Sequence, residues 1–428
     1  MEKTDPRYAA YIQILKEELV PAMGCTEPIA VAYAAARARA LLGRVPERVS
    51  IGASGSIIKN VKSVIVPNTG HMKGIDTAAA AGIIAGKAEK LLEVIAEVTP
   101  EQVEEIRRYR EKTPIHVELI DQGPVFDIVM DVFAGEDSAR VRIACDHTNI
   151  VREEKNGEVL LDLPVPADDE SGLTDRSVLS MEGIWDFINT VDIREVRPTL
   201  DRQIAYNTAI SLEGLLGDYG ANIGRVLLQS YGDSIENRAK AMASAGSDAR
   251  MNGCELPVII NSGSGNQGIT ASVPVIEYAK HLGSPKEKLY RALCLSNLTA
   301  IHQKTRIGRL SAYCGAVNAG SGAGCGIAYL RGGDYQAIIH TLVNSLAIVS
   351  GIICDGAKAS CAAKIASAVD AGILGYNMYL MNQQFVAGDG IVGKGVEQNI
   401  INVGRLGHDG MRETNNEIIH IMIDEGTD

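Results

Sequence analysis

The feature that most constrains this fold is a change of pattern near residue 165. Between residues 115 and 162, four segments alternate apolar and polar side chains and are joined by Gly-Glu-Asp-Ser and Asn-Gly-Glu turns, which predicts an antiparallel sheet. From residue 180 to about residue 381, apolar side chains recur at helical spacing between glycines, which predicts one helix after another. Residues 163–176 are rich in Pro, Asp and Ser, so they form the expected linker.

Two domains of different class follow from this change, and the predicted fold class is α+β. Residues 1–165 are expected to form a mixed α/β domain, in which helices cover an antiparallel sheet and residues 49–58 form a strand. Residues 176–416 are expected to form an all-helical domain, whose many Ala and Gly residues allow close helix contacts. The apolar run at 417–424 has strand length, so residues 417–428 are expected to return to the first domain as a strand.

The charge distribution excludes two classes of binding protein. The chain has a net charge of −12 and no block of Lys or Arg, so it lacks the basic surface needed to bind nucleic acid or an anionic membrane. Its first residues, Met1-Glu-Lys-Thr-Asp, carry no apolar signal-peptide core, which predicts a cytoplasmic protein. The apolar run 337–353 approaches the length of a membrane span. Its His340, Asn344 and two Ser favour a buried helix instead.

Eight cysteines make metal or thiol chemistry the first hypothesis. The cytosol keeps thiols reduced, so disulfides are not expected. Cys314 lies in Ser-Ala-Tyr-Cys-Gly, and Cys354 and Cys361 form a Cys-x6-Cys pair. Three thiolates suit a soft metal or an iron–sulfur cluster, and on a four-iron cluster they would leave one iron open for Lewis-acid catalysis. Buried structural thiols are the alternative for these three, and they are the role expected for Cys145, Cys254, Cys294 and Cys325.

Cys25 and three Gly-containing turns are the other candidates for chemistry. Cys25 follows Gly24 and precedes a helix that begins near Pro28, where backbone N–H groups and the helix dipole favour a thiolate. The turn Asn-Ser-Gly-Ser-Gly-Asn-Gln-Gly at 261–268 opens a helix, and such a turn can bind a phosphate or the carboxylate of an amino acid. This turn matches neither the P-loop nor the dinucleotide motif. The turns at 54–56 and 68–71 are candidates for the same reason.

Taken together, five stretches of the chain resemble the L-cysteine desulfidase family, which is related to the bacterial iron–sulfur L-serine dehydratases. They are GCTEPIAVA (24–32), SGSIIKNVKSVIVPNTG (54–70), SGSGNQGI (262–269), GRLSAYCG (308–315) and CDGAKASCAAK (354–364). These stretches keep the order of the family and are spread over most of the chain. One departure is Ala316, where many relatives have a second Cys, but that Cys is not a core ligand of the cluster.

The resemblance implies a mixed α/β domain followed by an all-helical domain that carries a [4Fe-4S] cluster. It implies that the cluster is held by Cys314, Cys354 and Cys361, and that Cys25 is the proton acceptor. The implied enzyme is a carbon–sulfur lyase, which converts the small amino acid L-cysteine and water to pyruvate, ammonia and sulfide. The residues expected to bind the substrate are Thr26, Ser56, Asn68, Ser264 and Asn266. Assembly into a homo-oligomer is left open.

Three other functions stay open at this point. An iron–sulfur L-serine dehydratase would use the same cluster, with water as the leaving group. A pyridoxal-phosphate lyase would need a Schiff-base lysine, for which Lys358 and Lys364 are unmarked candidates. A non-catalytic iron–sulfur sensor would bind the amino acid without consuming it, but the sequence shows no DNA-binding motif through which it could act.

Overall fold

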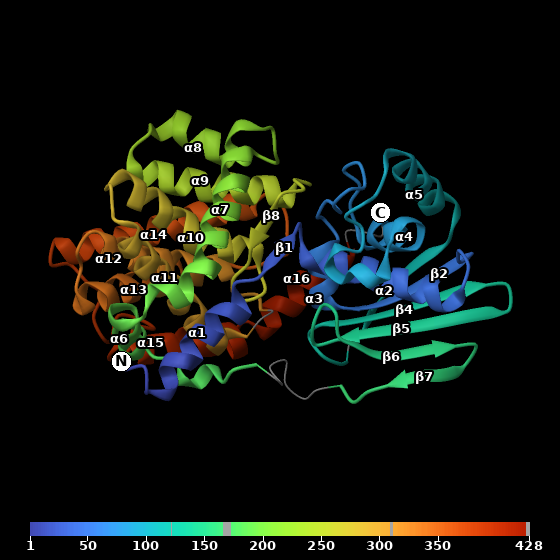
Figure 1. Ribbon diagram of the computed structural model, residues 1–428, viewed down its shortest axis with the longest axis horizontal. Helices are drawn as coiled ribbons and strands as arrows, with labels where there is room; N and C mark the ends of the chain where they lie inside the picture. Colours follow the sequence, from blue (N-terminus) through green and yellow to red (C-terminus); the bar gives the residue numbers. More distant parts are fainter. Residues whose placement is uncertain (121, 166–172, 309–310, 425–428) are drawn as a thin grey trace.

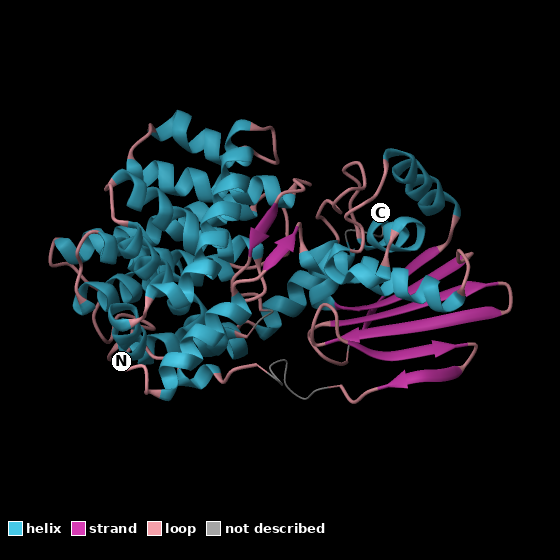
Figure 2. Ribbon diagram, viewed as in Figure 1, coloured by secondary structure: helices cyan, strands magenta, loops and turns pink. Residues whose placement is uncertain are grey.

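The computed structural model of the protein describes residues 1–120, 122–165, 173–308 and 311–424. A helical unit lies beside a second unit, in which helices lie on a sheet (Figures 1 and 2). The predicted α+β fold is confirmed. Within the predicted linker 163–176, residues 166–172 lie outside the described residues.

The larger sheet has six strands in the order β3-β2-β4-β5-β6-β7. Their bounds are β2 (Arg48–Ser54), β3 (Ile115–Ile120), β4 (Asp127–Ala134), β5 (Asp137–Ala144), β6 (Ile150–Lys155) and β7 (Glu158–Asp162). Strands β4 to β7 pair antiparallel in sequence order, as their alternation predicted. β2 and β3 are parallel, because the chain between them crosses over through helices. The alternate residues Ile128, Met130 and Val132 of β4 are fully buried, so one face of the sheet forms a core.

Helices α2 (Thr26–Leu42) and α4 (Ile75–Ala85) cover this sheet. α2 packs on β4 and β5, and α4 packs on α2 through small residues. A Cβ atom at Gly82 would lie 2.1 Å from the carbonyl oxygen of Ala32, so the two backbones are in direct contact. The other helices of this unit are α3 (Gly55–Val61), η1 (Ala88–Glu93) and α5 (Pro100–Lys112).

The helical unit combines the first helix of the chain with those that follow the linker. Its α-helices are α1 (Pro6–Glu18), α6 (Met181–Thr190), α7 (Ile193–Leu216), α8 (Ile223–Tyr231), α9 (Ile235–Met251), α10 (Gly265–His281), α11 (Lys286–Ile307), α12 (Gly315–Leu330), α13 (Tyr335–Val349), α14 (Cys361–Leu380) and α15 (Val396–Arg405). It also contains the short turns of helix η2 (Arg176–Val178) and η3 (Leu406–Gly410), and an antiparallel pair of strands, β1 (Pro21–Met23) and β8 (Pro257–Ile259).

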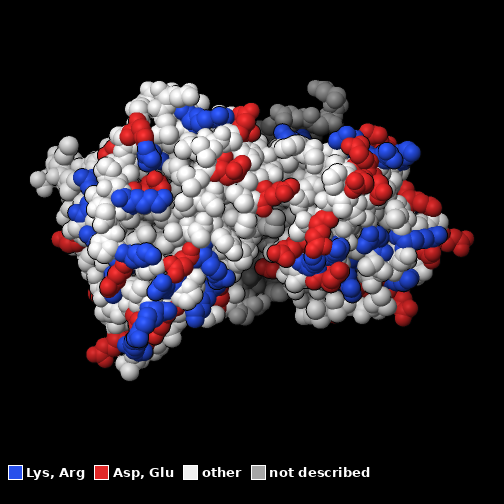
Figure 3. Space-filling view, turned by 45° about the horizontal axis from the view of Figure 1, so that its top comes forward, with Lys and Arg blue, Asp and Glu red and all other residues white. Residues whose placement is uncertain are grey.

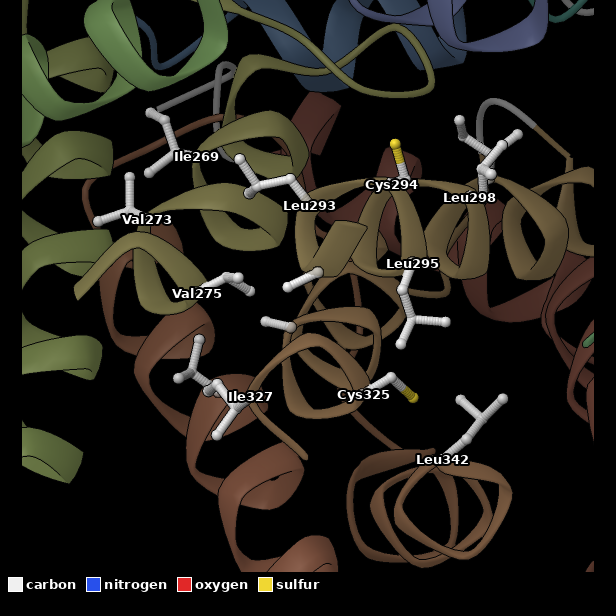
Figure 4. Close-up of a cluster of buried hydrophobic side chains, with 14 of the residues drawn as sticks. Ile269, Val273, Val275, Leu293, Cys294, Leu295, Leu298, Cys325, Ile327 and Leu342 are labelled. Atoms are coloured by element: carbon white, nitrogen blue, oxygen red, sulfur yellow. The ribbon is translucent and has the colours of Figure 1, made fainter. Parts of the chain in front are cut away.

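The core of the helical unit is built from aliphatic side chains of neighbouring helices. Figure 4 shows part of it, with residues from α10, α11, α12 and α13: Ile269, Val273, Val275, Leu293, Leu295, Leu298, Ile327 and Leu342. Cys294 and Cys325 are fully buried in the same cluster, which agrees with the expected structural role of these thiols.

Glycine allows helices α12 and α14 to pack with their backbones in contact. A Cβ atom at Gly320 would lie 2.6 Å from the carbonyl carbon of Ala368, and one at Gly324 would lie 2.7 Å from the Cα atom of Gly372. Real side chains essentially never approach so closely, so each of these positions needs glycine. Because α12 and α14 are held in this way, their positions relative to each other are set by the backbone itself.

Three expectations from the sequence differ from the structure. Residues 417–424 belong to helix α16 (Arg412–Asp424) rather than to a strand, and α16 packs on α3 of the sheet unit; residues 425–428 lie outside the described residues. The strand expected at 49–58 ends at Ser54, and helix α3 begins at Gly55. α1 packs in the helical core, so residues 1–165 are not one packed unit. In the first two cases a short apolar run satisfied two patterns, and in all three contacts with distant residues decided the outcome.

The surface carries charges of both signs. On the face in Figure 3, Lys and Arg side chains are interspersed with Asp and Glu side chains over both units. Among the described residues, no helix is both long enough and apolar enough to cross a membrane. The apolar run 337–353 instead supplies most of α13, where Ile338, Thr341, Leu342, Asn344 and Ser345 are fully buried.

The contact between α12 and α14 gives a first prediction. Gly324→Val should lower the free energy of unfolding by about 1–3 kcal/mol, because the new side chain forces the two backbones apart. Urea unfolding followed by circular dichroism measures the change. Gly351→Val is the matched control, since a Cβ atom there meets nothing within 4 Å. Equal unfolding midpoints for the two variants would contradict the role of Gly324.

Candidate active site

A pocket at the junction of the two units collects most of the reactive side chains described above. The sheet unit contributes the start of α2 and the helix α3, and the helical unit contributes the ends of several helices. The residues that line the pocket and could take part in chemistry are Cys25, Glu27, Lys59, Asn60, Arg250, Ser264, Asn266, Gln267, Lys304, Tyr313, Cys314, Cys354 and Cys361. Residues that are far apart in the sequence therefore share one cavity.

Backbone pairing brings Cys314 and Cys354 together. The N–H of Cys314 donates to the carbonyl of Ile352 at 3.1 Å, and the N–H of Cys354 donates to the carbonyl of Ala312 at 2.6 Å. Tyr313 and Ile353 thus form an antiparallel bridge, with one cysteine directly after each of them. Two segments some forty residues apart are fixed side by side by this pairing.

Cys361 reaches the same pocket from the first residue of α14. Its thiol donates to the carbonyl of Gly356 at 3.5 Å, within the loop that joins it to Cys354. Gly356 has a φ of +97°, and a Cβ atom there would lie 2.1 Å from the carbonyl oxygen of Lys59. The loop therefore needs glycine both for its backbone conformation and for its contact with α3. Asp355 holds the loop in shape through ion pairs with Lys358 and Lys364.

The electrostatics of these thiols fit metal ligands. Cys314 caps the N-terminus of α12 and Cys361 begins α14, positions where the helix dipole favours negative charge. Burial, and next the neighbouring Cys354, raise the pKa of the Cys314 thiol to about 12. Without a metal this thiol therefore stays protonated at neutral pH. A bound cation supplies the positive charge that favours the thiolate, so metal binding would release protons from the site.

Lys59 places a positive charge in the same pocket. The side chain is 2% exposed, and its Nζ donates to Oδ1 of Asn415 in α16 at 2.7 Å. Burial lowers the pKa of Lys59, while the nearby Cys354 and Asp355 act to raise it. A buried cation is costly unless negative charge lies nearby. Three thiolates, or a cluster bound to them, would provide this charge.

The three thiols are soft donors of the kind that an iron–sulfur cluster uses. Within the described part of the chain, no group of three or more His, Cys, Asp or Glu side chains is arranged to hold one metal ion. In a cluster each thiolate binds a different iron, so the sulfur atoms need not converge on one point. The donor set of Cys314, Cys354 and Cys361, the two helix N-termini and the Lys59 cation therefore fit a cluster.

Cys25 and Glu27 form a hydrogen-bonded pair at the start of α2. The Cys25 thiol donates to Oε2 of Glu27 at 3.0 Å and is only 3% exposed. Burial, followed by the charge of Glu27, raises the pKa of Cys25 well above its usual range. The expectation that the helix N-terminus lowers this pKa is therefore wrong: desolvation and a neighbouring carboxylate outweigh the helix dipole.

Glu27 is held as an ionised carboxylate. Burial acts to raise its pKa, but the charge of His147 and the hydrogen bond from Cys25 outweigh burial, so the pKa is lowered. Oε1 accepts from Nδ2 of Asn60 at 3.1 Å, and Oε2 also accepts from the hydroxyl of Thr26 at 3.1 Å. The pocket thus contains a protonated thiol in contact with a carboxylate that can accept its proton.

The Gly-rich turn forms another wall of the pocket. Asn261 and Ser264 bond to each other through their backbones, with Ser262 and Gly263 at positive φ between them. Ser264 then caps α10, since its Oγ accepts from the N–H of Gln267 at 3.5 Å. The side chain of Asn261 is held by Asn297: Nδ2 of Asn261 donates to Oδ1 of Asn297 at 3.0 Å. A buried amide network therefore positions the start of α10.

Six of the nine site residues proposed from the sequence line this pocket: Cys25, Ser264, Asn266, Cys314, Cys354 and Cys361. Thr26 is buried and does not line this pocket, and its hydroxyl donates a hydrogen bond to Oε2 of Glu27. Ser56 lines a different pocket, beside α16. Asn68 donates from Nδ2 to the carbonyl of Ile95 at 2.9 Å. A role of Thr26, Ser56 or Asn68 in binding substrate thus stays a prediction that this pocket does not support.

Several pocket residues were not singled out from the sequence: Glu27, Lys59, Asn60, Arg250 and Gln267. Glu27, Asn60 and Gln267 lie inside the stretches CTEP, IIKNV and SGNQG, so polar residues within these motifs were an available signal. Arg250 stands in Asp-Ala-Arg-Met, which carries no motif. The packing of α9 against α10 and other helices brings it to the site.

Comparison with known proteins identifies the family. The family model for the serine dehydratase alpha chain matches residues 89–420, which is most of this chain. The chain belongs to the serine dehydratase alpha chain family. Membership indicates a lyase of the iron–sulfur serine dehydratase type, and with it an iron–sulfur cluster. The matched range includes Cys314, Cys354 and Cys361, whereas Cys25 and Glu27 lie before it.

Full-length relatives carry the name UPF0597 protein. One from Desulfitobacterium hafniense is 59% identical, and the alignment covers 99% of each chain. One from Lachnoclostridium phytofermentans is 53% identical over 97% of this chain and 100% of its own length. A third, from Treponema denticola, is 46% identical over 97% of this chain and 98% of its own. The similarity to these relatives thus extends over both units of the fold.

The Cys25–Glu27 pair gives a second prediction. Glu27→Gln removes the carboxylate charge, so the pKa of Cys25 should fall and its thiolate should form at lower pH than in the unaltered protein. The rate at which iodoacetamide alkylates Cys25, followed by peptide mass spectrometry from neutral to alkaline pH, measures this shift. Glu255→Gln, at an exposed position outside the pocket, is the control. An unchanged pH profile in Glu27→Gln would show that the two side chains do not interact.

Proposed function

We propose that the protein is an L-cysteine desulfidase that eliminates sulfide from the β-carbon of L-cysteine and forms pyruvate and ammonia. The observation that carries this proposal is the shared pocket, which is lined both by three cysteine thiols and by a thiol–carboxylate pair. The first set is suited to binding a soft metal, and the second is suited to moving a proton. Cluster-dependent elimination at an amino acid uses both functions.

The cluster ligands in this proposal are Cys314, Cys354 and Cys361. When bound, a [4Fe-4S] cluster on these thiolates supplies an open iron as a Lewis acid for the leaving group. Lys59 contributes a positive charge close to the ligands and so offsets the negative charge of the site. The loop 354–361, which rests on α3 at Gly356, keeps two of the ligands at the boundary between the units.

The proton chemistry in this proposal is carried out by Cys25 and Glu27. Cys25 takes the α-proton of the substrate as it passes its own proton to Oε2 of Glu27, 3.0 Å away. A concerted transfer of this kind does not require a free thiolate at Cys25, which its raised pKa would disfavour. Asn60 and Thr26 hold the carboxylate in place as it receives the proton. Loss of the β-substituent leaves aminoacrylate, which hydrolyses to pyruvate and ammonia.

L-Serine is the second candidate substrate, since the family takes its name from serine dehydratase. L-Cysteine is preferred here because an open iron binds soft sulfur readily. The pocket wall also includes the apolar side chains of Met251, Ala316, Ala357 and Ile365, which suit a thiol better than a hydroxyl.

A third prediction tests the reaction. Protein purified without oxygen should be brown, and it should release sulfide and pyruvate from L-cysteine with a higher kcat/KM than it shows with L-serine. Cys354→Ser should lose both iron and sulfide release, whereas Cys294→Ala, which alters a buried thiol of the core, should keep both. Iron content, sulfide and pyruvate are measured on each preparation. A colourless, iron-free protein with full activity would rule out the proposal, and a preference for L-serine would make the protein a serine dehydratase.

A fourth prediction concerns the proton acceptor. Cys25→Ser and Glu27→Gln should each lower kcat by about 10²–10⁴-fold, the usual contribution of a positioned base. Iron content should stay unchanged in both, because neither residue is a proposed ligand. Steady-state kinetics with L-cysteine, together with iron analysis, measures this. If either variant kept its kcat, the corresponding side chain would have no part in proton transfer.

A further inference from the structure

Arg250 is a buried cation whose charge acts on Glu27 without forming an ion pair with it. It lies in the last turn of α9, lines the pocket and is 4% exposed. Its Nη1 donates to Oδ1 of Asn266 at 3.2 Å, while its Nε has no hydrogen-bond partner among the described residues. No carboxylate in that part of the chain forms an ion pair with it. Burying an unpaired guanidinium is costly, so this arrangement calls for an anionic ligand.

The guanidinium lies against the N-terminus of α10. A Cβ atom at Gly265 would come within 2.2 Å of Nε of Arg250, so glycine at the first residue of α10 makes room for it. The helix N-terminus carries a partial positive charge of its own. Two positive groups placed together repel each other unless an anion binds between them. A carboxylate at this position would interact favourably with both groups.

Gln267 offers the complementary group. Its side chain is 5% exposed and lies against Gly315, where a Cβ atom would come within 2.5 Å of its Cδ. Its Oε1 is buried and has no hydrogen-bond partner among the described residues. Gly315 directly follows Cys314, so this amide lies between the start of α10 and a proposed cluster ligand. A free amide oxygen accepts hydrogen bonds, and an ammonium group is a suitable donor.

We propose that Arg250 and Gln267 recognise the α-carboxylate and the α-ammonium group of a free amino acid. The identity of the reacting amino acid rests on the proposed function, but the recognition of its α-groups rests only on these two side chains. The charge of Arg250 acts on both Cys25 and Glu27, so the carboxylate site adjoins the proton-transfer pair. A substrate bound by its carboxylate there has its α-carbon close to Cys25. Amines and acids that lack one of the two groups bind more weakly.

The fifth prediction uses ligands that bind but cannot eliminate. L-Alanine has both α-groups and no leaving group, ethylamine lacks the carboxylate, and propionate lacks the ammonium group. Isothermal titration of the anaerobic holoprotein should give dissociation constants for ethylamine and propionate at least about tenfold above that for L-alanine, since each loses a charged hydrogen bond. Arg250→Gln should raise the dissociation constant of L-alanine by about 100-fold. It should change that of ethylamine by no more than about threefold. Gln267→Met should raise the dissociation constant of L-alanine by about tenfold and leave that of propionate unchanged.

Arg238→Gln is the matched control, because Arg238 lies on the same helix with its side chain exposed and paired to Asp233. It should bind all three ligands as the unaltered protein does. If Arg250→Gln fails to fold, Arg250→Lys replaces it; this variant keeps the charge but loses the two-pronged geometry, and L-alanine should still bind more weakly. The proposal is overturned if the unaltered protein does not bind L-alanine, or if Arg250→Gln weakens L-alanine and ethylamine equally.

These outcomes separate the two proposals. If L-alanine binds as expected but neither L-cysteine nor L-serine is eliminated, the proposed reaction fails while recognition of the α-groups stands. If L-cysteine is eliminated at the same KM by Arg250→Gln, the reaction stands and recognition by Arg250 fails. A fall in kcat/KM that comes mainly from a higher KM would agree with both proposals.

Discussion

Backbone contact between α12 and α14 positions much of the proposed site. Both helices begin at the pocket, one after the cap residue Cys314 and the other at Cys361. Glycines at 320, 324 and 372 remove the side chains that would otherwise separate them. Two helix N-termini are thereby held close together, each with a thiol. Their dipoles add to the charge of Lys59 from the other unit, so the polarity of the pocket results from how whole elements are packed.

Local sequence was enough to find part of this site. Cys314, Cys354, Cys361, Ser264 and Asn266 stand in compact motifs whose composition is unusual, and all of them line the pocket. The same kind of evidence also selected Ser56 and Asn68, which do not line it. A turn rich in Gly, Ser and Asn indicates that the backbone can bind something, but it does not indicate which cavity that turn will face. That depends on contacts between segments far apart in the chain.

The fold shows the same division. The alternation in β4 to β7 and the helical spacing after residue 180 predicted the α+β class, because each pattern extends over many residues. The run at 417–424 was too short for periodicity to distinguish strand from helix, and its packing on α3 decided the outcome. The pKa of Cys25 likewise depends on burial and on Glu27, which a helix-dipole argument alone leaves out. Arg250 had no local signal at all, since its place beside Gly265 results from the packing of α9 on α10.

The contact between Lys59 and Asn415 links the site to the order in which the chain is made. Lys59 lies in α3 of the sheet unit, whereas Asn415 lies in α16, the last helix that the structure describes. α16 also packs against Gly55, where Ile419 occupies the space that a side chain would need. During synthesis, therefore, the charge beside the proposed cluster gains its partner only after all three ligand cysteines have left the ribosome. Completion of the site therefore waits for α16, which is made after the segments that carry all three proposed ligands.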